Sequence, residues 1–287
     1  MAADIPLSTT ALPEIFTDWF ADRHWAPHSH QMDMVAAGRA GCSALLIAPT
    51  GGGKTLLAAS AVGLVHSRYL HRQTGLVLWI VPNEAIYQQT LAALSDRDHP
   101  YRQLLNVAGA GRVKILEKNA PLSAEVVSSQ LCVMVLMLAS AARRPKETLR
   151  FFRDRGSVHG FFPREDDVDA HFELLAAIPN LDVYAPLGMD AEHAKLQKGS
   201  IVKDSLGNVM RLMRPMVIID EQQRAYTENA LSTIDGFNPS FVLELSATPR
   251  VDRDGARGAN VLVDVRGTDL DAEEMIKLPI NVDVRPR

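Results

Sequence analysis

Six short apolar runs, separated by longer stretches with helical spacing, constrain the fold of this chain more than any other feature of its sequence. Most of these runs are continuously apolar, as expected for strands that are buried on both faces. The predicted strands are Ala44–Ala48, Leu76–Val81, Val113–Leu116, Cys132–Leu138, Met216–Asp220 and Val242–Ser246. Their alternation with helices predicts an α/β fold in which helices cover both faces of a mostly parallel sheet.

The segments between the strands predict helices and one long interruption. The predicted helices are His30–Ala40, Lys54–Arg72, Asn83–Leu94, Ala124–Gln130 and His171–Ala177. The polar tracts Asp96–Pro100 and Arg164–Asp169 are expected to be surface loops. The stretch from Arg143 to Arg214 is long, polar and repeatedly interrupted by Gly and Pro. We expect it to be an insertion that decorates the sheet before its fifth strand.

A glycine-rich segment follows the first predicted strand and opens the next helix. It reads Ala48-Pro49-Thr50-Gly51-Gly52-Gly53-Lys54-Thr55. Glycines let the backbone amides turn toward phosphate groups, and the helix N-terminus adds a favourable dipole. Lys54 would reach the outer phosphates and Thr55 would offer its hydroxyl to Mg²⁺. In this strand-to-helix context the segment predicts a phosphate-binding loop for ATP, with Thr50 to Thr55 as its contacts, rather than a plain glycine-rich turn.

Two adjacent carboxylates end the fifth predicted strand. Asp220 and Glu221 follow the apolar run Met216–Ile219, and the carboxyl ends of parallel strands are where ligands bind in open α/β sheets. Asp220 would hold Mg²⁺, and Glu221 would activate the water that attacks the terminal phosphate. Acidic residues are also common at helix N-termini for electrostatic reasons. The pair therefore indicates a nucleotide site only in combination with the glycine-rich segment.

A third motif, Ser246-Ala247-Thr248, ends the last predicted strand. Taken alone, it is a strand exit with hydroxyls that satisfy the local backbone. Together the three motifs resemble, in order and spacing, the first motor domain of superfamily 2 helicases and translocases, which is DEAD/DEAH-like and has the RecA-like P-loop NTPase fold. Ala48 stands where the general P-loop pattern has glycine, as is usual in that superfamily. The resemblance implies that Ser246 and Thr248 couple the nucleotide site to nucleic acid.

A narrower resemblance is to the helicase-like (Res) subunit of type III restriction enzymes. It rests on Asp204–Val209, Arg211, Arg214 and Pro215 before the acidic motif, and on Gly236–Ser240 after it, and extends over roughly Trp25–Pro249. The family's acidic motif usually closes with His, whereas this chain has Gln223. Because that position helps couple hydrolysis to motion in the family, the coupling is in doubt, whereas Asp220 and Glu221 for hydrolysis remain.

Further contacts are implied by the same resemblance. Gln31 would pair with the adenine edge through its amide, although a solvated residue near a helix start is an equal reading. Pro82 and Asn83, after the second strand, correspond to the motif that holds the phosphodiester backbone, where a helix N-terminus would supply amides. A simple strand-to-helix turn explains Asn83 as well.

Two weaker clusters remain beside these contacts. Arg143, Arg144 and Lys146 could join the nucleic-acid track or form a solvated loop. His24, His28 and His30 lack metal-ligand spacing.

Composition sets broad limits on function. The chain has 287 residues, 47% hydrophobic residues and a net charge of −4, so it has no overall basic field for nucleic acid. Its cysteines, Cys42 and Cys132, fit reduced thiols in a core better than a disulfide framework. The N-terminus does not resemble a signal peptide, and the apolar run Leu131–Ala139 is too short to cross a bilayer. We expect a cytoplasmic protein without a membrane partner.

The domain organisation predicted by the resemblance is a short N-terminal segment, residues 1–24, and one motor domain, residues 25–287, with the insertion at about 143–214. The remaining Arg250–Arg287 is too short for a second motor domain or a nuclease, so we expect a half-motor that binds ATP with Mg²⁺ and hydrolyses it weakly.

Two hypotheses for function follow. The first is one domain of a DNA-dependent ATPase, a helicase or translocase of restriction or phage defence, with a second motor domain or a modification subunit as partner and RNA not excluded. The second is a nucleotide-responsive regulatory or adaptor module without motor activity. Lys54, Thr55, Asp220 and Glu221 favour the enzyme, whereas Gln223 favours the module.

Overall fold

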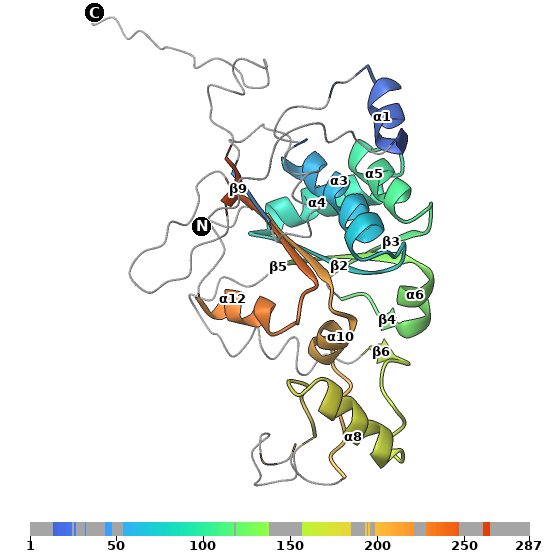
Figure 1. The fold of residues 1–287 in the computed structure, drawn as a ribbon, viewed down its shortest axis with the longest axis vertical. Coiled ribbons are helices and arrows are strands. Elements are labelled where there is room, and N and C mark those ends of the chain that lie inside the picture. The colour runs from blue at the N-terminus through green and yellow to red at the C-terminus, as the bar shows by residue number, and fades with distance from the viewer. Residues whose placement is uncertain are drawn as a thin grey trace, which may run out of the picture.

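A seven-stranded, fully parallel sheet organises the computed structural model of the chain (Figure 1). The structure describes residues 14–24, 26, 32, 44–47, 54–117, 119–137, 157–184, 193, 195, 199–220, 228–246 and 261–264. The strand order is β3-β5-β2-β7-β8-β1-β9. The strands are β1 (Ala44–Ile47), β2 (Gly75–Val81), β3 (Val113–Leu116), β5 (Leu131–Met137), β7 (Met216–Asp220), β8 (Phe241–Ser246) and β9 (Val261–Asp264).

The central strands bury both of their faces, as their continuous apolar sequences predict. In β2, Val77 and Trp79 belong to one hydrophobic core. Their neighbours Leu78 and Ile80 belong to another. Successive side chains of a strand point to opposite faces, so one apolar run supplies both cores. This is why β2 and β7 are buried along their whole length.

The first core lies between the sheet and four helices. These are α1 (Glu14–Ala21), α3 (Lys54–Leu64), α4 (Glu84–Ser95) and α5 (Pro100–Ala108), of which α3 and α5 pack closely together (Figure 1). The small residues Ala58, Ala59 and Ala61 of α3 are buried and permit this close approach. The helix continues as a π-helical turn, η1 (Val65–Tyr69). The ring of Tyr69 contacts the ring of Phe241 edge-on, with centroids 6.1 Å apart.

The second core lies on the opposite face, under α6 (Ala124–Ser129), α10 (Leu206–Met213) and α12 (Glu228–Asp235). Leu206, Val209 and Met210 of α10 are fully buried against the sheet. Ser205 caps this helix by accepting a hydrogen bond from the amide of Asn208. The helix α10 ends at Met213, shortly before β7 begins at Met216.

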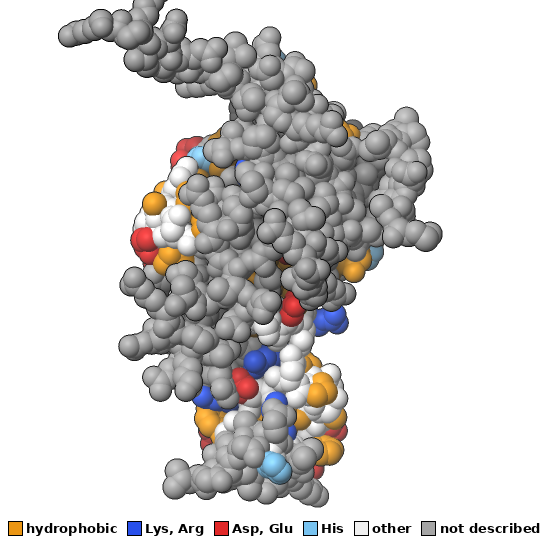
Figure 2. All heavy atoms as spheres, turned by 90° about the vertical axis from the view of Figure 1, so that its left-hand side faces the viewer, with side chains coloured by type: hydrophobic (Ala, Val, Ile, Leu, Met, Phe, Trp, Pro, Cys, Tyr) orange, Lys and Arg blue, Asp and Glu red, His pale blue; other side chains and the backbone are white. Residues whose placement is uncertain are grey.

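A small lobe extends from this second face. It comprises the two-stranded sheet of β4 (Leu122–Ser123) and β6 (Val158–His159), the helix α8 (Val168–Ala177) and a bridge between Val183 and Val202. Its own small core contains Leu175, Leu181, Val183 and Val202. Figure 2 shows hydrophobic side chains at the surface of this lower lobe, where Phe172 and Tyr184 are exposed.

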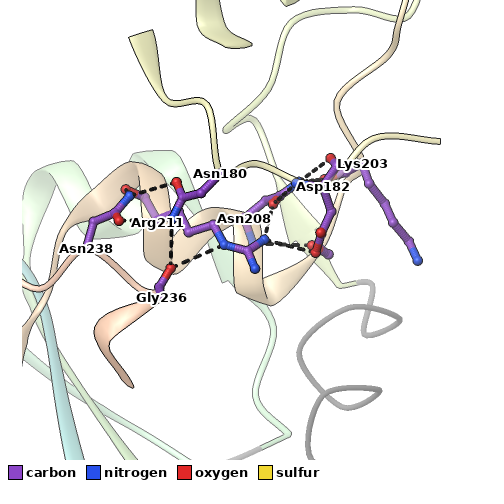
Figure 3. Close-up of polar contacts among 8 residues, drawn as sticks. Asn180, Asp182, Lys203, Asn208, Arg211, Gly236 and Asn238 are labelled. Atoms are coloured by element: carbon purple, nitrogen blue, oxygen red, sulfur yellow. Dashed lines mark hydrogen bonds and ion pairs between the residues drawn. The ribbon is translucent and has the colours of Figure 1, made fainter. Parts of the chain in front are cut away.

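Arg211 of α10 ties the lobe to the sheet layer (Figure 3). Its Nη1 atom lies 2.9 Å from a carboxylate oxygen of Asp182 and donates to Asn208 Oδ1 at 2.7 Å. Its Nε atom donates to the carbonyl of Gly236 at 3.3 Å. Asp182 belongs to the lobe, whereas Gly236 follows α12 and precedes β8. One side chain therefore joins three parts of the chain that lie far apart in sequence.

Amide side chains complete this polar clasp, which comprises Asn180, Asp182, Asn208, Arg211 and Asn238. Asn180 and Asn238 exchange hydrogen bonds of 3.0 Å in both directions. Asn208 accepts from the amide of Asp182 and donates to its carbonyl, both at 2.8 Å. Nearly every polar atom has a partner, which is the condition for a half-buried polar network to be stable.

The predicted strands are confirmed, with shifts of a single residue at some ends. Among the predicted helices, Lys54–Arg72 is α-helical only to Leu64 and leaves helical geometry after Tyr69. The two predicted surface loops are partly wrong, because Pro100 begins α5 and Asp169 lies inside α8. His99 and Asp167 cap those helices, so each polar tract is a helix start. Most of the predicted helix His30–Ala40 lies outside the described residues.

The stretch 143–214 is not uniform. Its described residues contribute β6, α8 and the Val183–Val202 bridge to the lobe, whereas α10 is part of the sheet's second core. The sequence does not distinguish α10 from the lobe clearly, because Asn208 and Arg211 of α10 belong to the polar clasp and make the helix look like part of a polar insertion. Among the described helices, none combines the length and the apolar character that a membrane crossing requires.

Candidate nucleotide-binding site

The carboxyl ends of three neighbouring strands bring the predicted motifs together. Asp220, the last residue of β7, is in register with Leu245 of β8, which is in register with Leu46 of β1. Ser246 is in register with Ile47, the last residue of β1. The glycine-rich segment, the acidic pair and the third motif therefore all leave the sheet at one edge, although about 170 residues of sequence separate the first from the second.

Lys54 and Thr55 form the first turn of α3, at the end of the helix that faces this edge. Both side chains are half-buried. The unpaired amides of a helix N-terminus and its dipole favour an anion there. Asp220 is 7% exposed and Ser246 is fully buried. A lysine, a hydroxyl and a carboxylate thus converge where the sequence predicts phosphate and Mg²⁺.

Tyr101 joins this group, and the sequence analysis did not identify it. Burial and then the negative charge of Asp220 raise the pKa of the Tyr101 phenol, whereas an interaction with the Thr55 side chain lowers it. Its ring also meets that of His99 edge-on, with centroids 4.4 Å apart. The Tyr101 hydroxyl therefore lies near both Thr55 and Asp220. No sequence signal marks Tyr101, because the packing of α5 on α3 brings it to the site.

Pro82 and Asn83 follow β2 at the same edge of the sheet. Ile80 is in register with Ile219, so the end of β2 is level with Asp220. Asn83 is exposed and caps α4, with its side-chain oxygen accepting from the amide of Ile86 at 3.0 Å. The carboxamide oxygen is thus used locally, and backbone amides of the first turn of α4 remain as the groups that could meet a phosphate.

Several predicted site residues lie outside the described residues. They are Gln31, Thr50, Gly51, Gly52, Gly53, Glu221, Gln223 and Thr248. The covalent chain still places Gly53 directly before Lys54, and Glu221 directly after Asp220. Their predicted roles remain predictions.

The donors at this edge fit Mg²⁺ by their chemistry. Magnesium prefers hard oxygen ligands and keeps several of its waters, so that one or two protein groups plus substrate phosphates suffice. The Thr55 hydroxyl and the Asp220 carboxylate are such donors, and both lie beside the Tyr101 hydroxyl. Elsewhere among the described side chains, no three His, Cys, Asp or Glu residues are grouped so that they could hold a metal ion.

The fold and this edge are those of a parallel α/β domain in which α3 begins at Lys54 and a buried carboxylate, Asp220, ends β7, the arrangement that the sequence analysis compares with helicase-like motor domains. Residues 24–159 match the family described as type III restriction enzyme, res subunit. The resemblance inferred from sequence is thus confirmed for those residues, which contain the glycine-rich segment and the Pro82–Asn83 turn. The acidic and third motifs lie beyond the matched part.

Comparison with solved structures identifies a similar chain in a nuclease-deletion mutant of the Type ISP restriction-modification enzyme LlaGI in complex with a DNA substrate mimic. The identity is 10% and the TM-score 0.41, over 93% of this chain and 21% of that chain. The present chain therefore spans about a fifth of the length of that structure. No curated protein sequence matches the chain.

Proposed function

We propose that this chain is the ATP-binding motor domain of a DNA-dependent ATPase, a helicase or translocase that serves restriction or phage defence. The observation that supports it most directly is the parallel register, which brings Asp220, Ser246 and the end of β1 before α3 to one edge of the sheet. Similarity to the res subunit over residues 24–159 supports the same class. The DNA substrate mimic belongs to the Type ISP enzyme, and DNA as the partner of this chain is part of the proposal.

In the proposed reaction, amides at the start of α3 and the Lys54 ammonium hold the outer phosphates of ATP and offset their charge. Thr55 and Asp220 would hold Mg²⁺, and the ion would supply positive charge to the phosphates. Glu221 accepts a proton from the water that attacks the terminal phosphate. Ser246, at the end of the strand beside β7, would relay changes at this edge to the segment that follows.

Complete stabilisation of the transferring phosphate in such motors needs arginines from a second domain. We therefore propose that this chain alone binds ATP with Mg²⁺ and hydrolyses it slowly. A second motor domain or a partner subunit would supply the missing groups.

The test is steady-state ATP hydrolysis with and without duplex DNA, beside a titration with a fluorescent ATP analogue. Glu221→Gln should retain nucleotide binding and lose hydrolysis, whereas Lys54→Ala should lose both. Tyr101→Phe keeps the ring but removes the hydroxyl, so it should weaken Mg²⁺-dependent binding more than Mg²⁺-free binding. Glu173→Gln, an exposed change on the distant helix α8, is the matched control.

Three results would refute parts of this proposal. An absence of nucleotide binding by the wild-type chain would remove the nucleotide site itself. Binding without hydrolysis, even with DNA and a modification subunit present, would favour a regulatory module. Hydrolysis that Glu221→Gln leaves intact would show that another base acts.

A further inference from the structure

The amino-terminal edge of the sheet, opposite the candidate nucleotide site, carries basic side chains that the proposed function does not use. Arg214 lies just before β7, and Arg72 lies in the turn before β2. These strands are neighbours, with Val77 opposite Met216, so Gly75 is level with Arg214. The Arg72 guanidinium packs on Gly75, because its Cζ and Nε atoms lie 3.4 Å from where a Cβ of residue 75 would stand. The two arginines therefore belong to one small region.

Arg72 holds two buried donors without an acceptor. Its Nε and Nη2 atoms are both inaccessible to solvent, and neither has a hydrogen-bond partner among the residues that the structure describes. These two atoms form one edge of the guanidinium, the edge that binds two oxygens of a carboxylate or phosphate side by side. Leaving a charged donor buried and unpaired is costly. Among the described residues, this edge of the guanidinium, the fork, therefore has two donors with no oxyanion acceptor.

The electrostatic surroundings of Arg72 are positive. Burial lowers the pKa of the guanidinium, and the positive charge of Arg214 lowers it further. Arg214 is itself exposed, so the region opens to solvent on its side. Two like charges held together in a partly dry place repel each other unless an anion lies between them. A doubly charged anion offsets both, whereas a single carboxylate offsets only one.

His66 adds a third donor close to Arg72. It lies in the π-helical turn η1 and is fully buried, and within the described part of the chain neither ring nitrogen has a hydrogen-bond partner. The backbone amide of Arg72 donates to the carbonyl of His66 at 2.9 Å, so the two residues are held together. Burial and then Arg72 lower the pKa of His66 to about 4. At neutral pH the ring is therefore uncharged and has one N–H to donate.

We propose that Arg72, with Arg214 and His66 beside it, forms a binding site for a phosphate group at the amino-terminal edge of the sheet. The unpaired fork supplies the bidentate contact and Arg214 supplies the second positive charge. Gly75, with φ of 126°, supplies the flat surface on which the guanidinium rests. The phosphate group is either free phosphate or part of a nucleic-acid backbone, since both present the same oxygens.

The site is separate from the candidate ATP site, which also binds phosphate, and the experiment must separate them. We would use the full chain with Lys54→Ala, and titrate it with inorganic phosphate at constant ionic strength in chloride. Calorimetry would report binding and thermal unfolding would report stabilisation, because a ligand that binds only the folded state raises its melting temperature. Arg72→Gln tests the fork, and Arg68→Gln on the exposed side of η1 is the matched control.

The proposal expects saturable phosphate binding that Arg72→Gln weakens about tenfold or more and that Arg68→Gln leaves unchanged. It also expects the order of the two melting temperatures, of the parent and of Arg72→Gln, to reverse when phosphate is added. Without phosphate, Arg72→Gln should melt at the same or a higher temperature than its parent, because the unpaired fork is gone. With phosphate, the parent should melt higher. Equal phosphate binding by the parent and Arg72→Gln, or no saturable binding by the parent, would overturn the site.

A second arm identifies the source of the phosphate group. Binding of a single-stranded oligonucleotide would be followed by fluorescence anisotropy in the same proteins. Competition by inorganic phosphate, together with loss of oligonucleotide affinity in Arg72→Gln, assigns the site to a nucleic-acid backbone. Phosphate binding without such competition assigns it to the free anion.

Discussion

Replacing Arg211 by alanine should destabilise the chain by about 3 kcal/mol. The side chains of Arg211 and Asp182 are only 17% and 14% exposed, and their charged atoms lie 2.9 Å apart. Removing one partner of a buried ion pair costs roughly 3–5 kcal/mol, because the other charge loses its compensation. The residual exposure of both side chains places the expected cost at the lower end of that range.

The remaining contacts of Arg211 determine which parts of the chain separate when the side chain is lost. Alanine also removes donors to Asn208 and to the carbonyl of Gly236. The Gly236 carbonyl keeps the amide of Asn180 as a donor, so this contact adds little to the cost. The small lobe should therefore loosen from α10 and from the segment that leads to β8.

Urea unfolding measures this cost, followed by fluorescence in a background in which Trp19 and Trp25 are replaced by Phe, so that buried Trp79 reports on the sheet, and by circular dichroism for the whole chain. Arg164→Ala is the matched control, since it breaks an ion pair with Asp166 that is 3.2 Å long but 87% and 72% exposed. That change should cost at most about 1 kcal/mol. A double-mutant cycle of Arg211 with Asp182 should show a coupling of about 1–3 kcal/mol. Equal costs for Arg211→Ala and Arg164→Ala, or an additive cycle, would refute the reasoning.

Three further predictions concern single side chains. The pKa of His66 is lowered to about 4, so the unfolded chain binds a proton more readily than the folded chain below about pH 6.5. The free energy of unfolding should therefore fall by about 2 kcal/mol between pH 7 and pH 5. In phosphate-free buffer, His66→Gln should reduce the dependence of this free energy on pH, and an unchanged dependence would contradict the assignment. Asn83→Ala should cost about 1 kcal/mol through loss of the cap on Ile86 while Asn83→Ser retains most of it, as thermal unfolding would show. Burial raises the pKa of the Cys132 thiol to about 11, so in a Cys42→Ser background iodoacetamide at pH 8 should label Cys132 only after unfolding; rapid labelling of the folded chain would contradict its burial.

Much of the architecture was predictable because burial on two faces leaves a clear signal in sequence. The continuous apolar runs of β2, β5 and β7 mark strands in the interior of a sheet. The helix starts at Pro100 and Val168 were missed because polar capping residues precede them and resemble loops. α10 was missed because Asn208 and Arg211 are polar for the sake of the clasp, although Leu206, Val209 and Met210 keep helical spacing.

The candidate nucleotide site was predictable as far as local chemistry reaches. Lys54, Thr55, Asp220 and Ser246 were predicted as site residues because their motifs lie at or after strand ends in the expected order; the parallel register brings these strand ends to one edge, and the roles of the residues stay predictions. Tyr101 could not be identified in this way. Its place depends on how α5 packs on α3, which involves residues about fifty positions apart.

The sequence by itself therefore determined six of the seven strands of the parallel sheet, missing β9, and the motifs at its carboxyl edge, because these depend on short patterns that one strand or one turn contains. Only the tertiary structure decided which distant side chains meet. The polar clasp around Arg211, the approach of Tyr101 to Thr55 and Asp220, and the pairing of Arg72 with Arg214 all depend on strand order and helix packing. Such contacts join residues with no fixed spacing in the chain, so no local pattern specifies them.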